Sequence, residues 1–235
     1  METIAGNLTE IREKIIKAAR RAGRDPERIR LIAVSKKVAP PLLRAALAAG
    51  QSLFGENYMQ EAREKIAAVG TGAEWHFIGH LQSNKAKDAA RHFAMVHTVD
   101  RLKLATELDR HAGLAGRILP VLVQVNVSGE TQKEGVAVEK AEALLAAMRE
   151  LPHLAVAGLM TMPPFTEDPE EARPWFRRLR ELGDGFAARG YFAKDRPHEL
   201  SMGMSGDYEV AIEEGATLVR IGTAIFGSRG LHPAD

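Results

Sequence analysis

The chain of 235 residues contains no cysteine. This absence excludes disulfide bonds, thiolate nucleophiles and zinc sites built on cysteine. It also fits a reducing compartment, where disulfides rarely form. The first residues, 1–7, lack a basic region followed by an apolar stretch, so we expect no signal peptide. We therefore predict a cytoplasmic protein.

The chain also lacks an excess of charge of either sign and any long apolar run. Lys and Arg total 32 against 31 for Asp and Glu, which gives a formal net charge of +1. This balance provides no electrostatic footprint for nucleic acid, and we predict none as a partner. No apolar run reaches the roughly 20 residues that a membrane-spanning helix needs, so we predict no membrane association.

Apolar strands and amphipathic helices alternate along the rest of the chain. Apolar residues at helical spacing, from Leu8 to Ala19, predict an extra helix that precedes the first strand. The predicted strands cover residues 31–35, 52–54, 74–78, 95–99, 118–127, 154–160, 199–201 and 217–221. Eight strands alternating with helices, without a long linker, predict an α/β protein with a single (β/α)8 TIM-type barrel domain over residues 1–235.

A doubly wound open sheet is the alternative, because periodicity does not reveal whether a sheet closes. The first strand is not followed by a Gly-x-Gly-x-x-Gly sequence. This absence counts against the dinucleotide-binding version of the open sheet.

Lys36 directly follows the apolar strand 31–35. An amine at the end of a buried strand is held by rigid backbone and partly desolvated. Desolvation favours the neutral amine, which is a nucleophile able to form a Schiff base. The alternative is a surface lysine whose stem lies along the strand end. Alternation along the strand favours Lys36 over its neighbour Lys37, which is expected on the opposite side.

Glycine and hydroxyl residues follow the last two predicted strands. Residues 201–207 read Ser-Met-Gly-Met-Ser-Gly-Asp, and residues 220–227 read Arg-Ile-Gly-Thr-Ala-Ile-Phe-Gly. We expect Ser205 to cap the helix that follows the first of these loops, leaving its first amides for an anion. In (β/α)8 barrels the loops after the last two strands commonly bind phosphate, so these two loops predict a phosphate site.

A Schiff-base lysine combined with a phosphate site implies pyridoxal 5′-phosphate (PLP), or an aldol reaction on a sugar phosphate. Arg220 helps to choose between them. It precedes Gly222 by two residues, so alternation can aim its side chain at the ring of a phosphate-bearing ligand. An arginine paired with a nearby carboxylate is the alternative reading.

Six ordered segments of the chain resemble the pyridoxal phosphate homeostasis protein family, whose members are PLP-binding barrels similar to the N-terminal domain of alanine racemase. The resemblance extends from Ile32 to Gly227. Its motifs read Ala33-Val34-Ser35-Lys36, Phe54-Gly55-Glu56-Asn57-Tyr58, residues 75–85 (WHFIGHLQSNK), Gly158-Leu159-Met160, residues 200–205 (LSMGMS) and residues 219–227 (VRIGTAIFG).

The resemblance implies a fold-type III PLP-binding barrel and assigns a role to each candidate site residue. Lys36 would carry PLP as an internal aldimine, a Schiff base, and Arg220 would face the pyridine nitrogen. His76 and Asn57 would lie beside the ring, with Met204 packed nearby. The phosphate would be held by Ser201, Ser205, Gly222 and Thr223. We predict no metal site.

The same resemblance implies a function in PLP homeostasis, namely storage, buffering and delivery of PLP to apo-enzymes without substantial turnover. An arginine beside the pyridine nitrogen stays charged and passes it no proton, which leaves the ring a poor electron sink. The chain ends at Asp235, without the racemase's second domain, so we expect a monomer with transient contacts to apo-enzymes.

Two alternatives remain from the sequence. The first is a PLP-dependent amino-acid racemase that uses Lys36 with His76 or Tyr58 as its second base. The second is a PLP-free lysine aldolase, which stoichiometric uptake of PLP would exclude.

Overall fold

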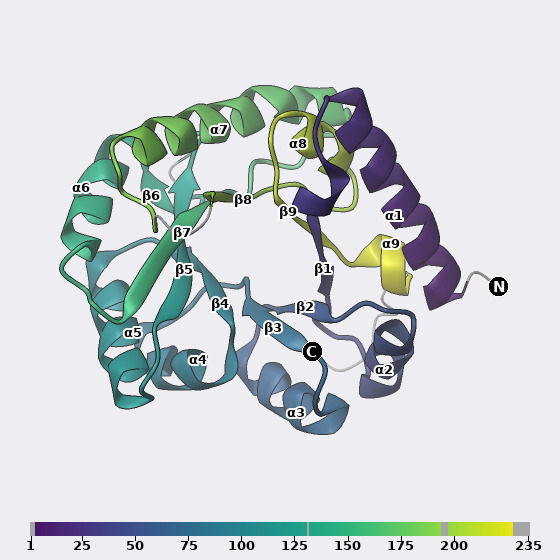
Figure 1. Cartoon of the computed structure of the whole chain (residues 1–235), viewed down its shortest axis with the longest axis horizontal. Helices are drawn as coiled ribbons and strands as arrows, with labels where there is room; N and C mark the ends of the chain where they lie inside the picture. The colour runs from purple at the N-terminus through teal and green to yellow at the C-terminus, as the bar shows by residue number, and fades with distance from the viewer. Residues whose placement is uncertain (1–2, 131, 194–196, 228–235) are drawn as a thin grey trace.

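The computed structural model describes residues 3–130, 132–193 and 197–227. Its strands form one parallel sheet that curls into a barrel, with helices around the outside (Figure 1). The barrel strands are β1 (Arg30–Val34), β2 (Leu53–Glu56), β3 (Glu74–Phe77), β4 (Met95–Val99), β5 (Leu119–Asn126), β7 (Leu154–Met160), β8 (Glu199–Ser201) and β9 (Leu218–Ile221). A two-residue strand, β6 (Val136–Ala137), pairs with the end of β5 outside this ring.

The helices follow the strands in the order that the sequence predicts. They are α1 (Ile4–Arg21), α2 (Pro40–Ala48), α3 (Met59–Val69), α4 (Ala86–His92), α5 (Leu102–Leu114), α6 (Val138–Met148), α7 (Arg173–Ala188), α8 (Tyr208–Glu213) and α9 (Thr223–Phe226). Three short 3-10 turns, η1 (Pro26–Arg28), η2 (Ser83–Lys85) and η3 (Pro169–Ala172), precede β1, α4 and α7.

Pairing between β4 and β5 closes the barrel. Val96 lies opposite Val121 and Val99 opposite Val123, so the sheet has no free edge at this point. The predicted (β/α)8 fold is therefore confirmed, and the open-sheet alternative is wrong. Strand β6 was not predicted, because two residues are too few to carry a periodic signal.

The extra N-terminal helix is also confirmed. The Thr3 side chain accepts a hydrogen bond from the amide of Gly6 and caps α1. Leu8, Ile11 and Ile15 are buried on one face of this helix. The helix packs on the outside of the barrel against α2, α8 and α9 (Figure 1), so it joins the first and last elements of the chain.

Two hydrophobic cores result from the alternation of side chains along the strands. The larger core lies between the strands and the surrounding helices. The smaller one fills the barrel interior with Ile32, Leu53, Met95, Leu122, Ala157, Met160 and Leu218. Between them, these cores hold the strands rigidly, so the residues that follow the strands stand on a fixed base.

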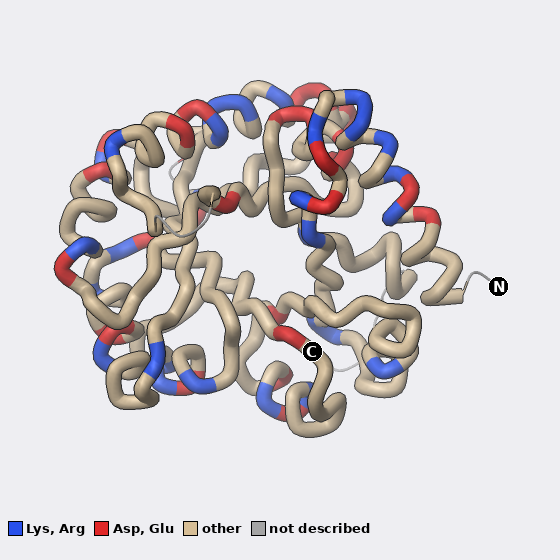
Figure 2. Tube along the Cα trace, viewed as in Figure 1, with Lys and Arg blue, Asp and Glu red and all other residues tan. Residues whose placement is uncertain are grey.

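The charged residues lie mainly on the outer helices, where Lys and Arg are interspersed with Asp and Glu (Figure 2). No helix within residues 3–130, 132–193 and 197–227 is both long enough and apolar enough to cross a membrane.

Candidate functional site

A cavity of about 290 Å³ opens at the end of the barrel where the strands finish. Functional sites of (β/α)8 barrels lie at this face. Seven of the residues predicted from the sequence line the cavity, namely Lys36, Asn57, Met204, Ser205, Arg220, Gly222 and Thr223. The structure therefore brings together residues from β1, β2, β8, β9 and the loops that follow them.

Lys36 reaches the cavity from a tight turn after β1. The amide of Val38 donates to the carbonyl of Ser35 at 2.9 Å, which closes the turn around Lys36 and Lys37. Lys37 has a φ of 58°, a left-handed conformation that side chains with a Cβ rarely adopt. Lys36 lines the cavity, whereas Lys37 is exposed and is not part of the wall. The geometry thus agrees with the predicted preference for Lys36.

Buried charged side chains form hydrogen bonds with the backbone of this turn, on the side away from the cavity. Lys65 Nζ donates to the Ser35 carbonyl, to Glu56 Oε1 and to Glu61 Oε2, each at 2.7 Å. Glu56 is fully buried, and its Oε1 also accepts from the Ser35 hydroxyl at 2.7 Å. Glu61 Oε2 accepts from the amide of Lys37 at 2.8 Å. All three donors of the Lys65 ammonium are used.

Asn57 occupies the wall next to β2. Its backbone amide donates to Glu56 Oε2 at 3.1 Å, which ties it to the same charged group. A Cβ on Gly79 would lie 2.2 Å from the Asn57 carbonyl oxygen, so only glycine allows the loop after β3 to pass this close. Asn57 Oδ1 is buried and has no hydrogen-bond partner among the described residues.

Hydroxyl and amide groups from two loops lie at the other side of the cavity. The amide of Gly222 approaches Ser205 Oγ at 3.4 Å, so the loops after β8 and β9 meet here. Gly203 permits this with a φ of 88°, and a Cβ there would lie 2.6 Å from that of Ala211. Thr223 follows at the first position of α9. The hydroxyl and amide groups of these two loops can therefore donate several hydrogen bonds to one bound anion.

The prediction that Ser205 caps the next helix is wrong. Helix α8 begins at Tyr208, and its N-cap is Asp207. Asp207 Oδ1 accepts from the amide of Met204 at 2.6 Å, which shapes the loop into a turn and moves Ser205 away from the helix end. Burial raises the pKa of Asp207.

Arg220 forms the floor of the cavity. Along β9, Leu218 belongs to the core inside the barrel, and Arg220 points the same way because side chains alternate. Its guanidinium donates to Ser201 Oγ at 2.6 Å and to the Thr161 carbonyl at 2.9 Å. Burial lowers its pKa to about 10, so it remains charged at neutral pH.

Two predicted residues, His76 and Ser201, do not line the cavity. Both lie inside the barrel below Arg220 and are buried. Along β3 and the residue that follows it, the side chains of His76 and Ile78 point the same way, and Ile78 is the one that lines the cavity. His76 therefore lies one layer below the position beside the ring that the resemblance implied. Ser201 reaches the site only through its bond with Arg220.

The sequence prediction missed several residues of the wall and one beneath it. Met162, Phe165, Thr166 and Asp207 line the cavity, the first three from the loop after β7. Loop residues carry no periodic signal, so only the fold places them. Beneath the cavity, His97 bonds to both His76 and Ser201. A histidine in the middle of a mostly apolar strand is the signal that could have identified it.

These features define the class of the protein as a (β/α)8 barrel. The site combines one lysine, one buried arginine and two donor-rich loops at the carboxyl ends of the strands. A family model described as "Alanine racemase, N-terminal domain" matches residues 6–230, and the chain belongs to this family.

Proteins similar to this chain share nearly its whole length. The "Pyridoxal phosphate homeostasis protein" of Escherichia coli (strain K12) is 47% identical over 236 residues, covering 97% of this chain and 98% of that protein. The protein of the same name from Aquifex aeolicus is 46% identical over 223 residues, covering 94% and 96%. The resemblance inferred from the six motifs is confirmed.

A solved structure of PipY from Synechococcus elongatus PCC7942, described as having PLP bound, has a TM-score of 0.84 with this chain. The two are 36% identical, and the match covers 96% of this chain and 100% of PipY.

Proposed function

We propose that this protein binds PLP in the cavity after the strands and serves PLP homeostasis, by storing, buffering and delivering the cofactor to apo-enzymes. The proposal rests on one observation: Lys36, Arg220 and the two loops after β8 and β9, which carry Ser205 and Thr223, all line one cavity. The PLP named in the PipY structure and the names of the bacterial relatives support the same function.

The residues present fit PLP in size and chemistry. A volume of about 290 Å³ is near the lower end of the range for small-ligand sites, about 300–1,000 Å³. Val34 and Ile78 supply apolar walls for a flat ring, and the Ser205 and Thr223 hydroxyls suit a phosphate. The buried Asn57 Oδ1 is an acceptor that a bound ligand can satisfy.

Lys36 is the group that would hold PLP covalently, through its amine and the PLP aldehyde with loss of one water. When bound, PLP supplies an electron sink for carbanions formed next to an amine. Arg220 limits that chemistry, because a guanidinium that stays charged donates hydrogen bonds but no proton. We infer from this residue that turnover is slight.

Neither residue predicted as the second base of a racemase lies on the described cavity wall. Tyr58 is 52% exposed and His76 is 1% exposed, and neither lines the cavity. Carrier function needs no second base, only a covalent hold that can be reversed. We propose that delivery occurs in the cytoplasm, from a monomer, through transient contact with the apo-enzyme.

The test is the visible absorption of the protein mixed with PLP, before and after borohydride reduction, followed by peptide mapping. We expect a yellow species that borohydride bleaches and fixes on Lys36. Lys36→Ala is expected to lose the fixed label, whereas the matched control Lys37→Ala keeps it. A label that stays in Lys36→Ala and disappears in Lys37→Ala would reverse the assignment.

Turnover is tested on the same samples by exchange of the α-hydrogen of L-alanine in deuterated water. Exchange no faster than with free PLP is expected, together with transfer of PLP to an added apo-enzyme. Fast exchange that depends on Lys36 would instead establish the racemase.

A further inference from the structure

A chain of hydrogen bonds crosses the barrel interior below the cavity. Its members are Glu74, His76, His97, Ser201 and Arg220, called here the interior chain. His76 Nε2 lies 2.9 Å from Glu74 Oε1, and His76 Nδ1 lies 2.9 Å from His97 Nε2. His97 Nδ1 lies 2.9 Å from Ser201 Oγ, which accepts from Arg220 at 2.6 Å.

The two ends of the interior chain can act in only one way. The Arg220 guanidinium has donors and no acceptor, so Ser201 Oγ must accept from it. Glu74 lies at the start of β3, at the opposite mouth of the barrel, and its Oε1 also accepts from Arg30 at 2.8 Å. Hydrogen bonds from His76 and, to a lesser extent, from Arg30 lower the pKa of Glu74 to about 2. At neutral pH Glu74 therefore only accepts.

These ends fix the tautomers of both histidines between them. Ser201 has one hydroxyl hydrogen left, which it donates to His97 Nδ1. His97 then carries its hydrogen on Nε2 and donates to His76 Nδ1. His76 carries its hydrogen on Nε2 in turn and donates to Glu74. Every bond of the chain is satisfied by two neutral imidazoles and by no other neutral arrangement.

Adding a proton to either histidine changes this order. A charged His97 would donate from Nδ1 to the second lone pair of Ser201, whose hydroxyl hydrogen would then lose its acceptor. A charged His76 would donate from Nδ1, so His97 could no longer donate to it from Nε2. Burial lowers the pKa of both histidines, and the positive charge of Arg220 lowers the pKa of His97 further. Both imidazoles are therefore more stable in their neutral form at neutral pH.

We propose that the interior chain positions Arg220 for the cofactor ring, with His97 as the central positioning residue in its Nε2–H tautomer. The inference rests on the proposed function, because it takes Arg220 to face bound PLP. Ser201 has its hydrogen directed to His97 and so offers its lone pairs to Arg220. The guanidinium is thereby held by Ser201 on one side and by the Thr161 carbonyl on the other.

The first test needs neither PLP nor an altered protein beyond those used for assignment. Apo protein labelled with ¹⁵N-histidine is examined by two-bond ¹H–¹⁵N correlation at pH 7, and His76→Gln and His97→Gln assign the two signals. We expect both residues as neutral imidazoles with hydrogen on Nε2. Hydrogen on Nδ1 of either residue, or a charged ring, overturns the proposal.

The second test asks whether the chain matters for the cofactor. His97→Leu keeps the volume but removes both ring nitrogens, and we expect about tenfold weaker PLP binding, as for loss of one hydrogen bond that supports a charged group. His97→Gln can accept from Ser201 and donate to His76, so it is expected to restore binding to within about threefold of wild type.

Thr98→Val is the matched control, since it removes a buried hydroxyl from the next residue of β4, where it bonds only the Gly79 carbonyl in the contacts described. Its PLP affinity is expected to match wild type. Equal binding by His97→Leu and wild type overturns the positioning role. A wild-type protein that takes up no PLP overturns the proposed function instead, while the tautomers of the apo protein still decide the interior chain.

Discussion

The position of Lys36 depends on two buried charged residues that do not line the cavity. Lys65 and Glu56 are buried 2.7 Å apart, directly behind the turn that carries Lys36. A buried ion pair adds little stability over an apolar pair, but losing one partner leaves an unpaired charge in the interior. Their role at the residue scale is to fix the Ser35 carbonyl and hydroxyl, and thereby the direction in which Lys36 leaves the strand.

Replacing Lys65 by methionine should therefore destabilise the fold strongly. We expect Lys65→Met to lower the free energy of unfolding by about 3–5 kcal/mol, because Glu56 is left buried without its cation. The measurement is urea unfolding at pH 7. The matched control is Lys14→Met, which breaks the exposed Lys14–Glu10 pair and should leave the unfolding midpoint unchanged.

A second substitution separates the charge from the packing. Adding Glu56→Gln to Lys65→Met removes the unpaired carboxylate, so part of the lost stability should return. If the double variant is less stable than Lys65→Met alone, the carboxylate is not the source of the loss. Borohydride labelling of Lys36 in the same variants reports whether the turn still presents the amine to PLP.

At this scale the sequence predicted residue types well and depth poorly. Lys36, Arg220 and Gly222 line the cavity, and each follows or ends a strand whose alternation is clear in the sequence. His76 was expected beside the ligand, yet Ile78 occupies that layer and His76 lies below it. Depth along a barrel depends on the stagger of neighbouring strands, and a single sequence does not encode that stagger locally.

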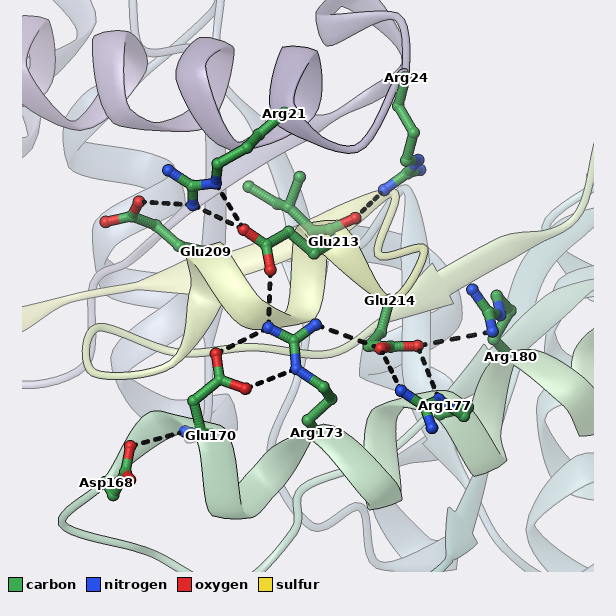
Figure 3. Close-up of polar contacts among 11 residues, drawn as sticks. Arg21, Arg24, Asp168, Glu170, Arg173, Arg177, Arg180, Glu209, Glu213 and Glu214 are labelled. Carbon is green, nitrogen blue, oxygen red and sulfur yellow. Dashed lines mark hydrogen bonds and ion pairs between the residues drawn. The ribbon is translucent and has the colours of Figure 1, made fainter.

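At the scale of elements, an ion network joins η3 and the start of α7 to the end of α8 and to α1 (Figure 3). Arg173 contacts Glu170 at 2.6 Å, Glu213 at 2.7 Å and Glu214 at 3.2 Å. Arg21 of α1 contacts Glu213 from the other side at 2.7 Å. The network thus ties α1, η3, α7 and α8 together beside the loop that contributes Phe165 to the cavity wall.

Within this ion network, replacing Arg173 should lower the free energy of unfolding most. Its side chain is only 24% exposed and bonds three carboxylates, so Arg173→Gln is expected to cost about 1–2 kcal/mol of unfolding free energy at pH 7. Arg177→Gln is the matched control, because Arg177 contacts the same Glu214 but is 53% exposed. Its effect should be clearly smaller in urea unfolding.

The pH dependence of this difference follows from the carboxylates. The hydrogen bond from Arg173 is the main cause of a lowered pKa at Glu213. A carboxyl group whose folded pKa is lowered contributes stability above its unfolded pKa and loses it as the pH falls. The gap between wild type and Arg173→Gln should therefore shrink between pH 5 and pH 3. An undiminished gap at pH 3 would mean that Arg173 acts through packing alone.

The order and type of most elements were predictable, because the alternation of strands and helices repeats in composition as well as in spacing. Closure was predicted from the number of strands alone, because no local pattern in the sequence marks the pairing of Val96 with Val121. The helix after β8 was predicted with Ser205 as its cap, whereas the Asp207 carboxylate, by binding the Met204 amide, delays the start of α8. Local turn chemistry overrode the expected cap.

At the scale of the whole molecule, the interior chain connects the two mouths of the barrel. Glu74 stands at one mouth beside Arg30, and Arg220 stands at the other beneath the cavity. The interior of the barrel is mostly apolar, and an apolar environment disfavours a charged imidazole. We therefore expect both buried histidines to be neutral in the folded protein. Unfolding exposes them to water, where a histidine takes up a proton near pH 6.5.

This difference makes acid stability a property of the interior chain. His76 and His97 both have a lowered pKa when folded, chiefly because of burial. Below pH 6.5 the unfolded state binds protons that the folded state does not, so stability is complete above pH 6.5 and falls as the pH decreases. Each histidine contributes a slope of up to about 1.4 kcal/mol per pH unit.

We therefore expect the unfolding free energy of the PLP-free wild type, measured in urea from pH 8 to pH 5, to fall below pH 6.5, because burial lowers the pKa of His76 and His97 only in the folded state. His97→Gln does not titrate and should lose about one proton of that slope. Thr98→Val, which removes a buried hydroxyl from the next residue of β4 and no titratable group, should keep the wild-type slope. Equal slopes in His97→Gln and wild type would mean that His97 is charged in the folded protein, which contradicts the neutral chain from which the position of Arg220 was argued.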